Sequence, residues 1–359
     1  MASSTLLTAL KKPQLRAAAL LMGLPSSGNM AELRQVIQQS AVQREHDKER
    51  SRIVSVDMGI KNLGICVLEA RQPARPTGPR NQQHSPSPHI KLVKWQTINV
   101  LDKLHRLTLL NRGLVEIHVE VSAKSTAVNA KTFRPSALSI AALDLAKYIW
   151  AFEPSHILIE NQRFRSGGGA AVQEWTLRVN ALESMLWACF QTLRDANAER
   201  SPEVHEISPK QVANFWCSRP YGLSSSVSDD LFSTTWKTKA EDEKEIRRTV
   251  DKKEKIALAR SWLSSEELKP HEDVAPELST EVQSVADAFL KQGRKTPRKK
   301  SESSPSSPQS LGKLDDLADC LLQGVAWVRW ENNRRKIRAM LEDLPEPQKS
   351  LISAKRKAE

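Results

Sequence analysis

The stretch SRIVSVDMGIKNLGICVLEA, residues 51–70, decides the fold of this chain. An apolar run ends in Asp57, breaks at Gly59 and resumes as a second apolar run, which predicts two strands, over 52–58 and 62–69, joined by a tight turn. This stretch alone leaves two interpretations of Asp57 open. It is either a polar turn residue of a hairpin or a catalytic or phosphate-facing carboxylate, and the rest of the chain has to decide.

Strands and helices alternate in the remaining pattern. Further strands are predicted over 90–100, 156–160 and 203–208, and helices over 136–152, 171–195, from Pro209 onward, 243–265, 276–291 and 313–344. Three strands followed by helices that alternate with strands predict an α/β fold, in which helices flank a mixed sheet. The Pro-rich residues 71–89 read as a long connection, and the segment of about 218–310 reads as a partly disordered insertion.

The composition favours a nucleic-acid-binding protein without a membrane segment. The 359 residues carry a formal net charge of +12, so the surface attracts polyanions, of which nucleic acid is the leading class. No apolar run approaches the ~20 residues that a membrane helix needs. The four cysteines and eight histidines are scattered along the chain. That pattern supports neither a disulfide framework nor a zinc site, and it fits a reducing, intracellular compartment.

The N-terminal residues combine a helical pattern with the composition of a targeting signal. Two helical patterns within residues 5–40, joined by GLPSSGN, resemble the SAP motif, a helix–turn–helix unit of DNA-binding proteins. The alternative is a helical hairpin that packs on the main domain. Residues 1–31 contain Lys11, Lys12 and several Ser and Thr but no acid, as mitochondrial transit peptides do. We expect Lys11 and Lys12 to contact DNA.

Two carboxylates end predicted strands. Asp57 ends the first strand, and Glu160 ends the strand HILIE in the same way. Strand ends at the carboxyl edge of a sheet are where α/β folds bind their ligands. The two acids are therefore candidates for one site.

Three further acids stand in the motif KLDDLADCLLQGVAWVRW, residues 313–330. On a helix, Asp316 and Asp319 share a face, and so do Asp315 and Asp319. Carboxylates that converge unpaired would repel one another, and Mg²⁺ or Mn²⁺ is the simplest remedy. Two such ions can activate water and steady the leaving oxygen of a phosphodiester. The acids therefore predict a two-metal phosphoryl-transfer site.

An ATPase of the actin or sugar-kinase type is the rival interpretation of Asp57. That fold needs two D-x-G loops and a glycine-rich adenosine site, whereas D-x-G occurs once here and the chain has only 13 glycines. No P-loop motif is present either. The rival is therefore disfavoured, and no small-molecule cofactor is expected.

Polar and basic residues near the acids are typical of nucleic-acid contacts. The motif NQRFRSGGG follows Glu160 directly, and its alternative interpretation is an ordinary flexible loop with solvated arginines. Besides Lys11 and Lys12, the candidates are Lys61, Asn62, Asn161, Gln162, Arg163, Phe164, Arg165 and Lys210.

Four motifs together, IVSVDMGIKNLGICVLE, HILIENQRFRSGG, EVHEISPKQVANFW and KLDDLADCLLQGVAW, resemble the fungal mitochondrial Holliday-junction resolvases, or cruciform-cutting endonucleases. These are related to RuvC resolvases and have an RNase H-like core, and a SAP-like N-terminal motif belongs to the same pattern. The resemblance covers about residues 5–40, 50–216 and 312–335. The resemblance does not extend to residues 218–310.

The resemblance implies a homodimer in the mitochondrial matrix that cuts four-way DNA junctions by paired symmetric nicks with Mg²⁺ or Mn²⁺. It implies that residues 1–41 form the SAP-like motif and that 50–345 form the RNase H-like catalytic domain. The implied catalytic acids are Asp57, Glu160, Asp316 and Asp319, with Asp315 as a further possible metal ligand. An RNA–DNA hybrid nuclease and a catalytically silent junction-binding protein stay open as alternatives.

Overall fold

The structure is a computed structural model, and it describes residues 4–42, 50–73, 87–100, 133–162, 174–217, 251–264, 275–292 and 313–342. The strands are β1 (Arg50–Asp57), β2 (Leu63–Arg71), β3 (His89–Ile98), β4 (His156–Glu160), β5 (Glu203–Ile207) and β6 (Glu277–Leu278). The helices are α1 (Ser4–Ala9), α2 (Lys12–Leu21), α3 (Met30–Val42), α5 (Pro135–Trp150), α6 (Glu174–Ala196), α7 (Pro209–Cys217), α10 (Lys252–Leu263), α11 (Thr280–Lys291) and α12 (Leu314–Glu342).

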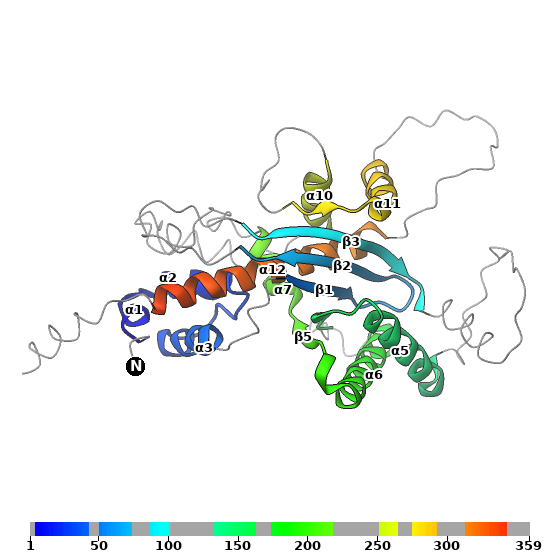
Figure 1. Ribbon diagram of the computed structural model, residues 1–359, viewed down its shortest axis with the longest axis horizontal. Coiled ribbons are helices and arrows are strands. Elements are labelled where there is room, and N and C mark those ends of the chain that lie inside the picture. The colour runs from blue at the N-terminus through cyan, green and yellow to red at the C-terminus, as the bar shows by residue number, and fades with distance from the viewer. Residues whose placement is uncertain are drawn as a thin grey trace, which may run out of the picture.

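The six strands form one mixed sheet in the order β5-β4-β1-β2-β3-β6. Strands β1, β2 and β3 are antiparallel neighbours, while β4 pairs parallel to β1, and β5 pairs parallel to β4. This arrangement, with helices on both faces, confirms the predicted RNase H-like α/β class (Figure 1). The two-residue strand β6 lies within the helix predicted over 276–291, which in the structure begins only at Thr280; so short a strand shows no alternation of apolar and polar residues that could have predicted it.

Alternate residues of the strands face two different layers of helices. From β1, Val54 and Val56 enter a core with α5 and α6, whereas Ile53 enters the core that contains α12. Central strands covered on both faces are apolar throughout, which accounts for the continuous apolar runs around Asp57. The side chain of Asp57 therefore lies on the α12 face, since it shares its parity with Ile53.

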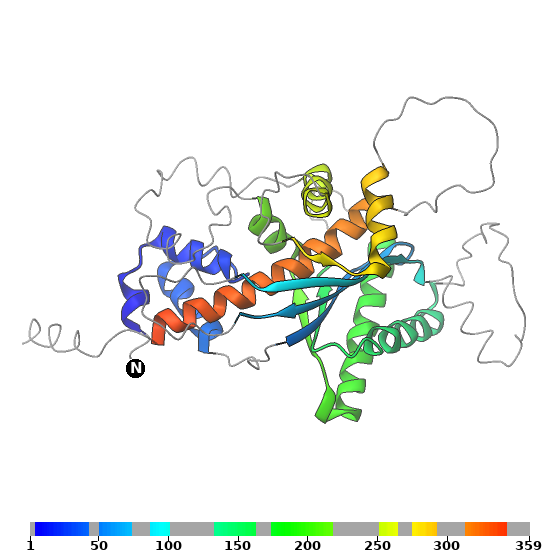
Figure 2. The same cartoon turned by 45° about the horizontal axis from the view of Figure 1, so that its top comes forward.

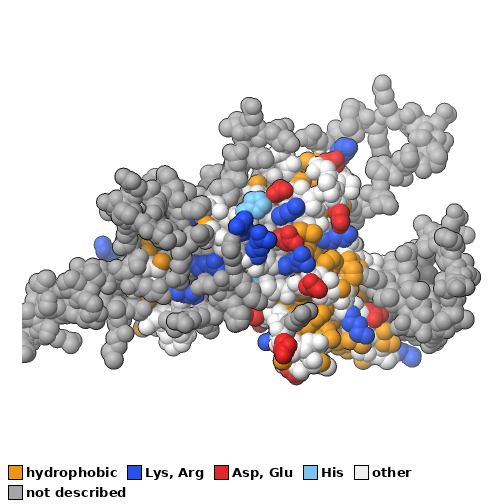
Figure 3. All heavy atoms as spheres, viewed as in Figure 1, with side chains coloured by type: hydrophobic (Ala, Val, Ile, Leu, Met, Phe, Trp, Pro, Cys, Tyr) orange, Lys and Arg blue, Asp and Glu red, His pale blue; other side chains and the backbone are white. Residues whose placement is uncertain are grey.

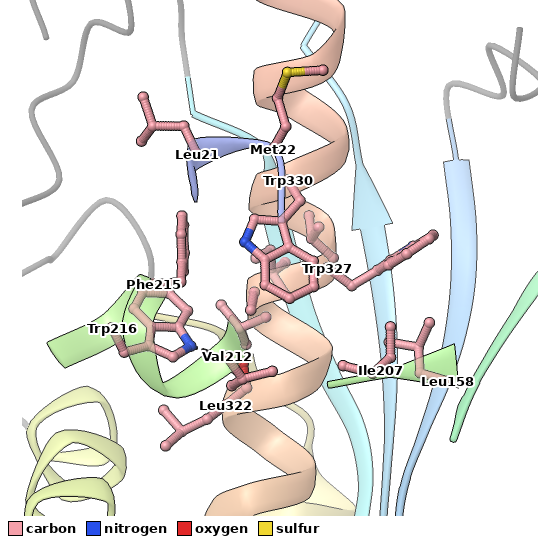
Figure 4. Close-up of a cluster of buried hydrophobic side chains, with 14 of the residues drawn as sticks. Leu21, Met22, Leu158, Ile207, Val212, Phe215, Trp216, Leu322, Trp327 and Trp330 are labelled. Carbon is pink, nitrogen blue, oxygen red and sulfur yellow. Dashed lines mark hydrogen bonds between the residues drawn. The ribbon is translucent and has the colours of Figure 1, made fainter. Parts of the chain in front are cut away.

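Helix α12 runs along the sheet, from the α1–α3 helices at one end to the neighbourhood of α10 and α11 at the other (Figure 2). Its tryptophans Trp327 and Trp330 are buried among residues of α2, α7 and the sheet (Figure 4). The indole N–H of Trp216 on α7 donates to the carbonyl of Leu322 at 3.0 Å. This apolar seam fixes α12 against one face of the sheet.

The helices α1–α3 pack on the C-terminal half of α12, as the helical-hairpin alternative expected. The amide of Asn333 donates to the carbonyl of Leu21 at 2.8 Å, and Arg338 donates to the carbonyl of Ala41. Both predicted helical patterns are present, with the short α1 ahead of them. DNA binding by this unit and the predicted domain boundaries stay predictions.

Several predicted segments lie outside the described residues. They are the linker at 43–49, most of the Pro-rich connection (74–86), and 218–250, 265–274 and 293–312 of the predicted insertion. The insertion does contribute α10, β6 and α11 to the described structure. Among the described residues, no helix is long and apolar enough to cross a membrane.

Candidate active site

Asp57 and Glu160 lie side by side at the carboxyl edge of the sheet. In the parallel pairing of β1 with β4, Val56 is opposite Ile159, so the next residues along each strand are the two acids. Asp57 is buried, with 8% of its surface exposed. Burial, the charge of Glu160 and a hydrogen bond between the two carboxyl groups raise the pKa of Asp57 well above its usual value. The predicted convergence of these two acids is present in the structure.

The first turns of α12 bring Asp316 and Asp319 to the same place. The charges of both carboxylates act on Asp57 and help to raise its pKa. Burial, followed by the charge of Asp315, raises the pKa of Asp316 to about 6. Burial also raises the pKa of Asp319, although Lys255 opposes that change. Glu160, Asp316 and Asp319 therefore all act electrostatically on the buried Asp57, although among the described residues no three of these carboxyl groups bring ligand oxygens within 4.8 Å of one another.

Asp315 faces a different neighbour. Its carboxylate forms an ion pair with Lys252. Burial acts to raise the pKa of Asp315, but the hydrogen bond and charge of Lys252 outweigh it, so this pKa is lowered. The two adjacent aspartates of the motif thus have opposite electrostatic surroundings.

Two lysines of α10 border the acid cluster, and sequence reasoning missed both. The ammonium Nζ of Lys255 lies 2.8 Å from Oδ1 of Asp319, and only 19% of its side chain is exposed. Burial alone would lower the pKa of Lys255, but the charges of Asp319, Glu160 and Asp57 raise it by more than that. The pKa is therefore raised overall, and the side chain stays cationic. The run DKKEK at 251–255 was the available signal, but it lies 63 residues from Asp315 in sequence.

A glycine allows α12 to approach the sheet closely beside Asp57. Gly64 is opposite Asp57 in the β1–β2 ladder. A Cβ atom on Gly64 would lie 2.4 Å from the carbonyl oxygen of Asp316 and 3.3 Å from Sγ of Cys320. The indole N–H of Trp95 on β3 donates to the carbonyl of Leu317 at 3.0 Å. These contacts hold the first turn of α12 over the end of β1.

The residues of the cluster fit divalent metal ions with oxygen ligands. Oδ2 of Asp316 is buried and has no hydrogen-bond partner among the described residues, a situation that an inner-sphere cation would relieve. The ammonium group of Lys255 pairs with the carboxylate of Asp319. The negative charges of Glu160, Asp316 and Asp319 all act on Asp57. An all-carboxylate donor set is the kind that Mg²⁺ and Mn²⁺ prefer.

The predicted nucleic-acid contacts are only partly gathered at this site. Asn161 and Gln162 directly follow Glu160; the amide of Asn161 donates to Glu206, and the backbone N–H of Gln162 donates to Glu183. Lys61 and Asn62 lie in the turn after Asp57, with Nζ of Lys61 5.8 Å from the ring centroid of Trp175. The remaining candidates are Lys210, exposed at the start of α7, Lys11 and Lys12, exposed in the distant α1–α3 unit, and Arg163, Phe164 and Arg165, which lie outside the described residues.

Comparisons with known proteins agree with this geometry. A curated relative, the Schizosaccharomyces pombe protein "Cruciform cutting endonuclease 1, mitochondrial", is 29% identical over 202 residues, which cover 55% of this chain. The chain spans 63% of that relative's length. The crystal structure of the yeast mitochondrial Holliday junction resolvase Ydc2 matches with a TM-score of 0.52 at 21% identity, covering 92% of this chain and 98% of that one, and supports the fold.

A Thermus thermophilus RuvC structure also matches, but its TM-score of 0.24, at 12% identity over 54% of this chain and 89% of that one, is too low to carry an argument. Residues 53–337 match the family described as "Mitochondrial resolvase Ydc2 / RNA splicing MRS1". This match begins just before Asp57 and ends beyond the acids of α12, so it contains the whole acid cluster. The chain belongs to this family of mitochondrial resolvases and RNA splicing proteins.

Proposed function

We propose that this protein is a metal-dependent endonuclease that resolves four-way DNA junctions in mitochondria by paired symmetric nicks. The observation that carries the proposal is the convergence of Asp57, Glu160, Asp316 and Asp319 at one edge of the sheet. The name of the fission-yeast relative supports the junction substrate and the mitochondrial location. The net charge of +12 supports a polyanionic substrate.

A silent nucleic-acid-binding protein is the second candidate, and the family description includes an RNA splicing protein as well as a resolvase. The burial of the acids favours the nuclease. Burying Asp57 beside the charges of Glu160, Asp319 and Asp316, which raises its pKa well above normal, destabilises a protein that has no metal to bind. Acids that served only as helix caps would need neither this burial nor the neighbouring strand-end residue Glu160.

In the proposed mechanism, Asp57, Glu160, Asp316 and Asp319 would hold two Mg²⁺ or Mn²⁺ ions. When bound, such ions make water a stronger nucleophile and stabilise the leaving oxygen of an in-line displacement. The protein side chains keep the site dry and rigid: Asp57 from a central strand, and Asp316 and Asp319 from a helix fixed to that strand. Lys252 and the more buried Lys255, which pair with Asp315 and Asp319, place two ammonium groups beside the acids, where they suit an incoming phosphodiester.

The structure favours Asp316 over Asp315 as the partner of Asp319. Asp316 acts electrostatically on Asp57 and has an unpartnered buried oxygen, whereas Asp315 is paired with Lys252. We propose that Asp315 positions Lys252 rather than binding metal.

A second copy of the chain is proposed to complete the enzyme, since a four-way junction needs two cuts and each chain has one acid cluster among its described residues. The apolar side chains that gather over α5 and α6 support this (Figure 3). Ile140 and Leu143 of α5 are 49% and 39% exposed, and Trp175 and Leu177 of α6 are 40% and 51% exposed. Such a patch on a soluble protein marks an interaction surface.

The decisive test offers a four-way DNA junction, linear duplex and an RNA–DNA hybrid with Mg²⁺. Paired nicks in the junction, lost in Asp57→Asn and Asp316→Asn while junction binding persists, are expected. The matched variant Asp315→Asn should keep most of the activity. Cleavage of the hybrid but not of the junction would show that the substrate is an RNA–DNA hybrid. Junction binding without cleavage of any substrate would show that the protein is a silent nucleic-acid-binding protein. Light scattering of Ile140→Asp and Leu177→Asp variants tests the dimer, which these charges should dissociate.

A further inference from the structure

Two histidines and a glutamate meet near the starts of β4 and β5, whereas the acid cluster lies where β1 and β4 end. His156 begins β4 and pairs with Glu203 at the start of β5, and His205 lies two residues further on. Nδ1 of His156 is 3.2 Å from Nε2 of His205, and Oε2 of Glu203 is 3.9 Å and 3.7 Å from these two nitrogens. The separation of these residues along the sequence had given no sign of this cluster.

The three ligand atoms have the spacing of a tetrahedral zinc site. Zn–N bonds of about 2.0–2.1 Å place two ligands of a tetrahedron roughly 3.3 Å apart. The nitrogen–nitrogen distance of 3.2 Å meets this value, and the glutamate oxygen needs to move by only a few tenths of an ångström. One of these atoms from each residue lies within 4.8 Å of the other two. Without an ion the two ring nitrogens are hydrogen-bonded to each other, and a bound ion would replace that hydrogen bond.

The surroundings hold the two rings in place. His156 and His205 are 15% and 18% exposed, and the ring centroid of His205 lies 4.2 Å from that of Trp327 on α12. Burial, then the charges of His156, Arg334 and Arg194, lowers the pKa of His205 to about 3.

The charged groups that face the cluster come from two helices, α12 and α6, besides the strands. Arg334 of α12 is paired with Glu331 and lies over the ring of Trp327 at 5.2 Å, so part of its charge is already balanced. Arg194 of α6 contributes weakly to the shift at His205. Glu203 supplies a carboxylate directly within the cluster. The ligand set therefore carries the negative charge that a divalent ion needs.

We infer that His156, Glu203 and His205 form a second metal site, selective for Zn²⁺, that joins the starts of β4 and β5. It is distinct from the acid cluster, because His156 stands four residues, or about 13 Å, before Glu160 on β4, and His205 is opposite Leu158, two residues before Glu160. Two imidazoles and one carboxylate favour zinc, whereas the all-carboxylate cluster favours Mg²⁺ or Mn²⁺. Water completes the coordination. The bound ion joins the start of β4, the strand that ends in Glu160, to the neighbouring strand β5.

The test uses the untagged, metal-stripped full chain and Co²⁺ as a spectroscopic probe of the zinc site. The wild type is expected to show the visible absorption of tetrahedral Co²⁺ at one equivalent, and Zn²⁺ should abolish it. At free Zn²⁺ 100-fold above the dissociation constant, the melting temperature should rise on the order of 5 °C. Both signals should vanish in Glu203→Gln and His205→Gln and persist in Asp57→Asn.

Two results would overturn the inference. One is a wild type without tetrahedral Co²⁺ absorption or a zinc-dependent shift in melting. The other is a signal that survives in Glu203→Gln and His205→Gln but disappears in Asp57→Asn, which would assign the ion to the acid cluster. Metal-free melting of each variant is measured first; Glu203 is 38% exposed in its side chain, so its near-isosteric replacement keeps the test informative if His205→Gln misfolds. The outcome is independent of junction cleavage.

Discussion

Replacing Gly64 by alanine should uncouple DNA binding from cleavage. The new Cβ would lie 2.4 Å from the backbone oxygen of Asp316 and 3.1 Å from its carbonyl carbon. Ordinary contact begins at 3.4 Å, so the first turn of α12 must move by about 1 Å. The clashing atom is helix backbone rather than the tip of a flexible side chain. The displaced turn carries Asp316 and Asp319, whereas Asp57, opposite Gly64, stays on β1.

A shift of this size is large for a metal-dependent active site. A misplacement of about 1 Å typically lowers a rate by ~10²-fold, which corresponds to about 2.7 kcal/mol of transition-state stabilisation. The overpacked seam should also lower the free energy of unfolding by about 1–3 kcal/mol. Junction affinity should change little, since it depends on positive surface charge that the substitution leaves in place.

Single-turnover cleavage of a four-way junction in Mg²⁺, paired with a binding measurement without metal, checks this prediction. Gly324→Ala is the comparison variant in the same seam, because its added Cβ would meet only side-chain atoms: Cδ1 of Leu68 at 2.8 Å, Sγ of Cys66 at 3.2 Å and Cβ of Ser55 at 3.3 Å. That variant also gains helix propensity, by roughly 1 kcal/mol, and should retain more cleavage activity than Gly64→Ala. Wild-type cleavage by Gly64→Ala would refute the claim that the contact between β2 and α12 places the acids.

Three further predictions concern the same seam. The pKa of Asp316 is raised to about 6, so its contribution to stability is full at low pH and is lost as the pH rises through 6. The metal-free wild type should therefore lose more stability between about pH 5 and 7 than the Asp316→Asn variant does. Thermal melting in EDTA measures this difference. Lys255→Gln should lower the melting temperature of the metal-free protein more than that of the Mg²⁺-saturated protein, since the ions replace the lost cation beside Asp319; equal losses would contradict this. Gln323→Leu should reduce the free energy of unfolding by about 1–3 kcal/mol in urea titrations, with an unchanged value arguing against a structural role for its hydrogen bonds.

Most strands and helices, and the acidic residues of the candidate site, could be predicted from the sequence because each has a signal in the neighbouring residues. Apolar runs that end in Asp57 and Glu160 define two strands, and parallel strands bring their carboxyl ends to one edge of a sheet. Helical spacing placed the acids of α12 on one face. That spacing could not choose between Asp315 and Asp316, because both lie within a turn of Asp319. The choice depends on Lys252, which comes from another helix.

The missed features depend on packing between distant segments. Lys252 is 63 residues from Asp315, and His156 is 49 residues from His205. Charged runs such as DKKEK usually belong to solvated helix faces, so nothing local indicates that α10 lies over the acids. The histidine cluster likewise depends on the register of β4 with β5, which sequence periodicity does not specify.

Gln323 indicates why α12 occupies one register on the sheet. An apolar helix face alone allows neighbouring registers of similar free energy, but Gln323 is 2% exposed in an otherwise apolar seam. Its amide nitrogen lies 3.0 Å from Oγ of Ser55, with the carbonyl oxygens of Val56 and Leu158 at 3.3 Å and 3.4 Å. A helix shifted by one turn would leave this amide buried without partners, at a penalty of about 1–3 kcal/mol. Because Gln323 follows Asp319 by one helical turn, the register it selects is the one that sets the acids over Asp57 and Glu160.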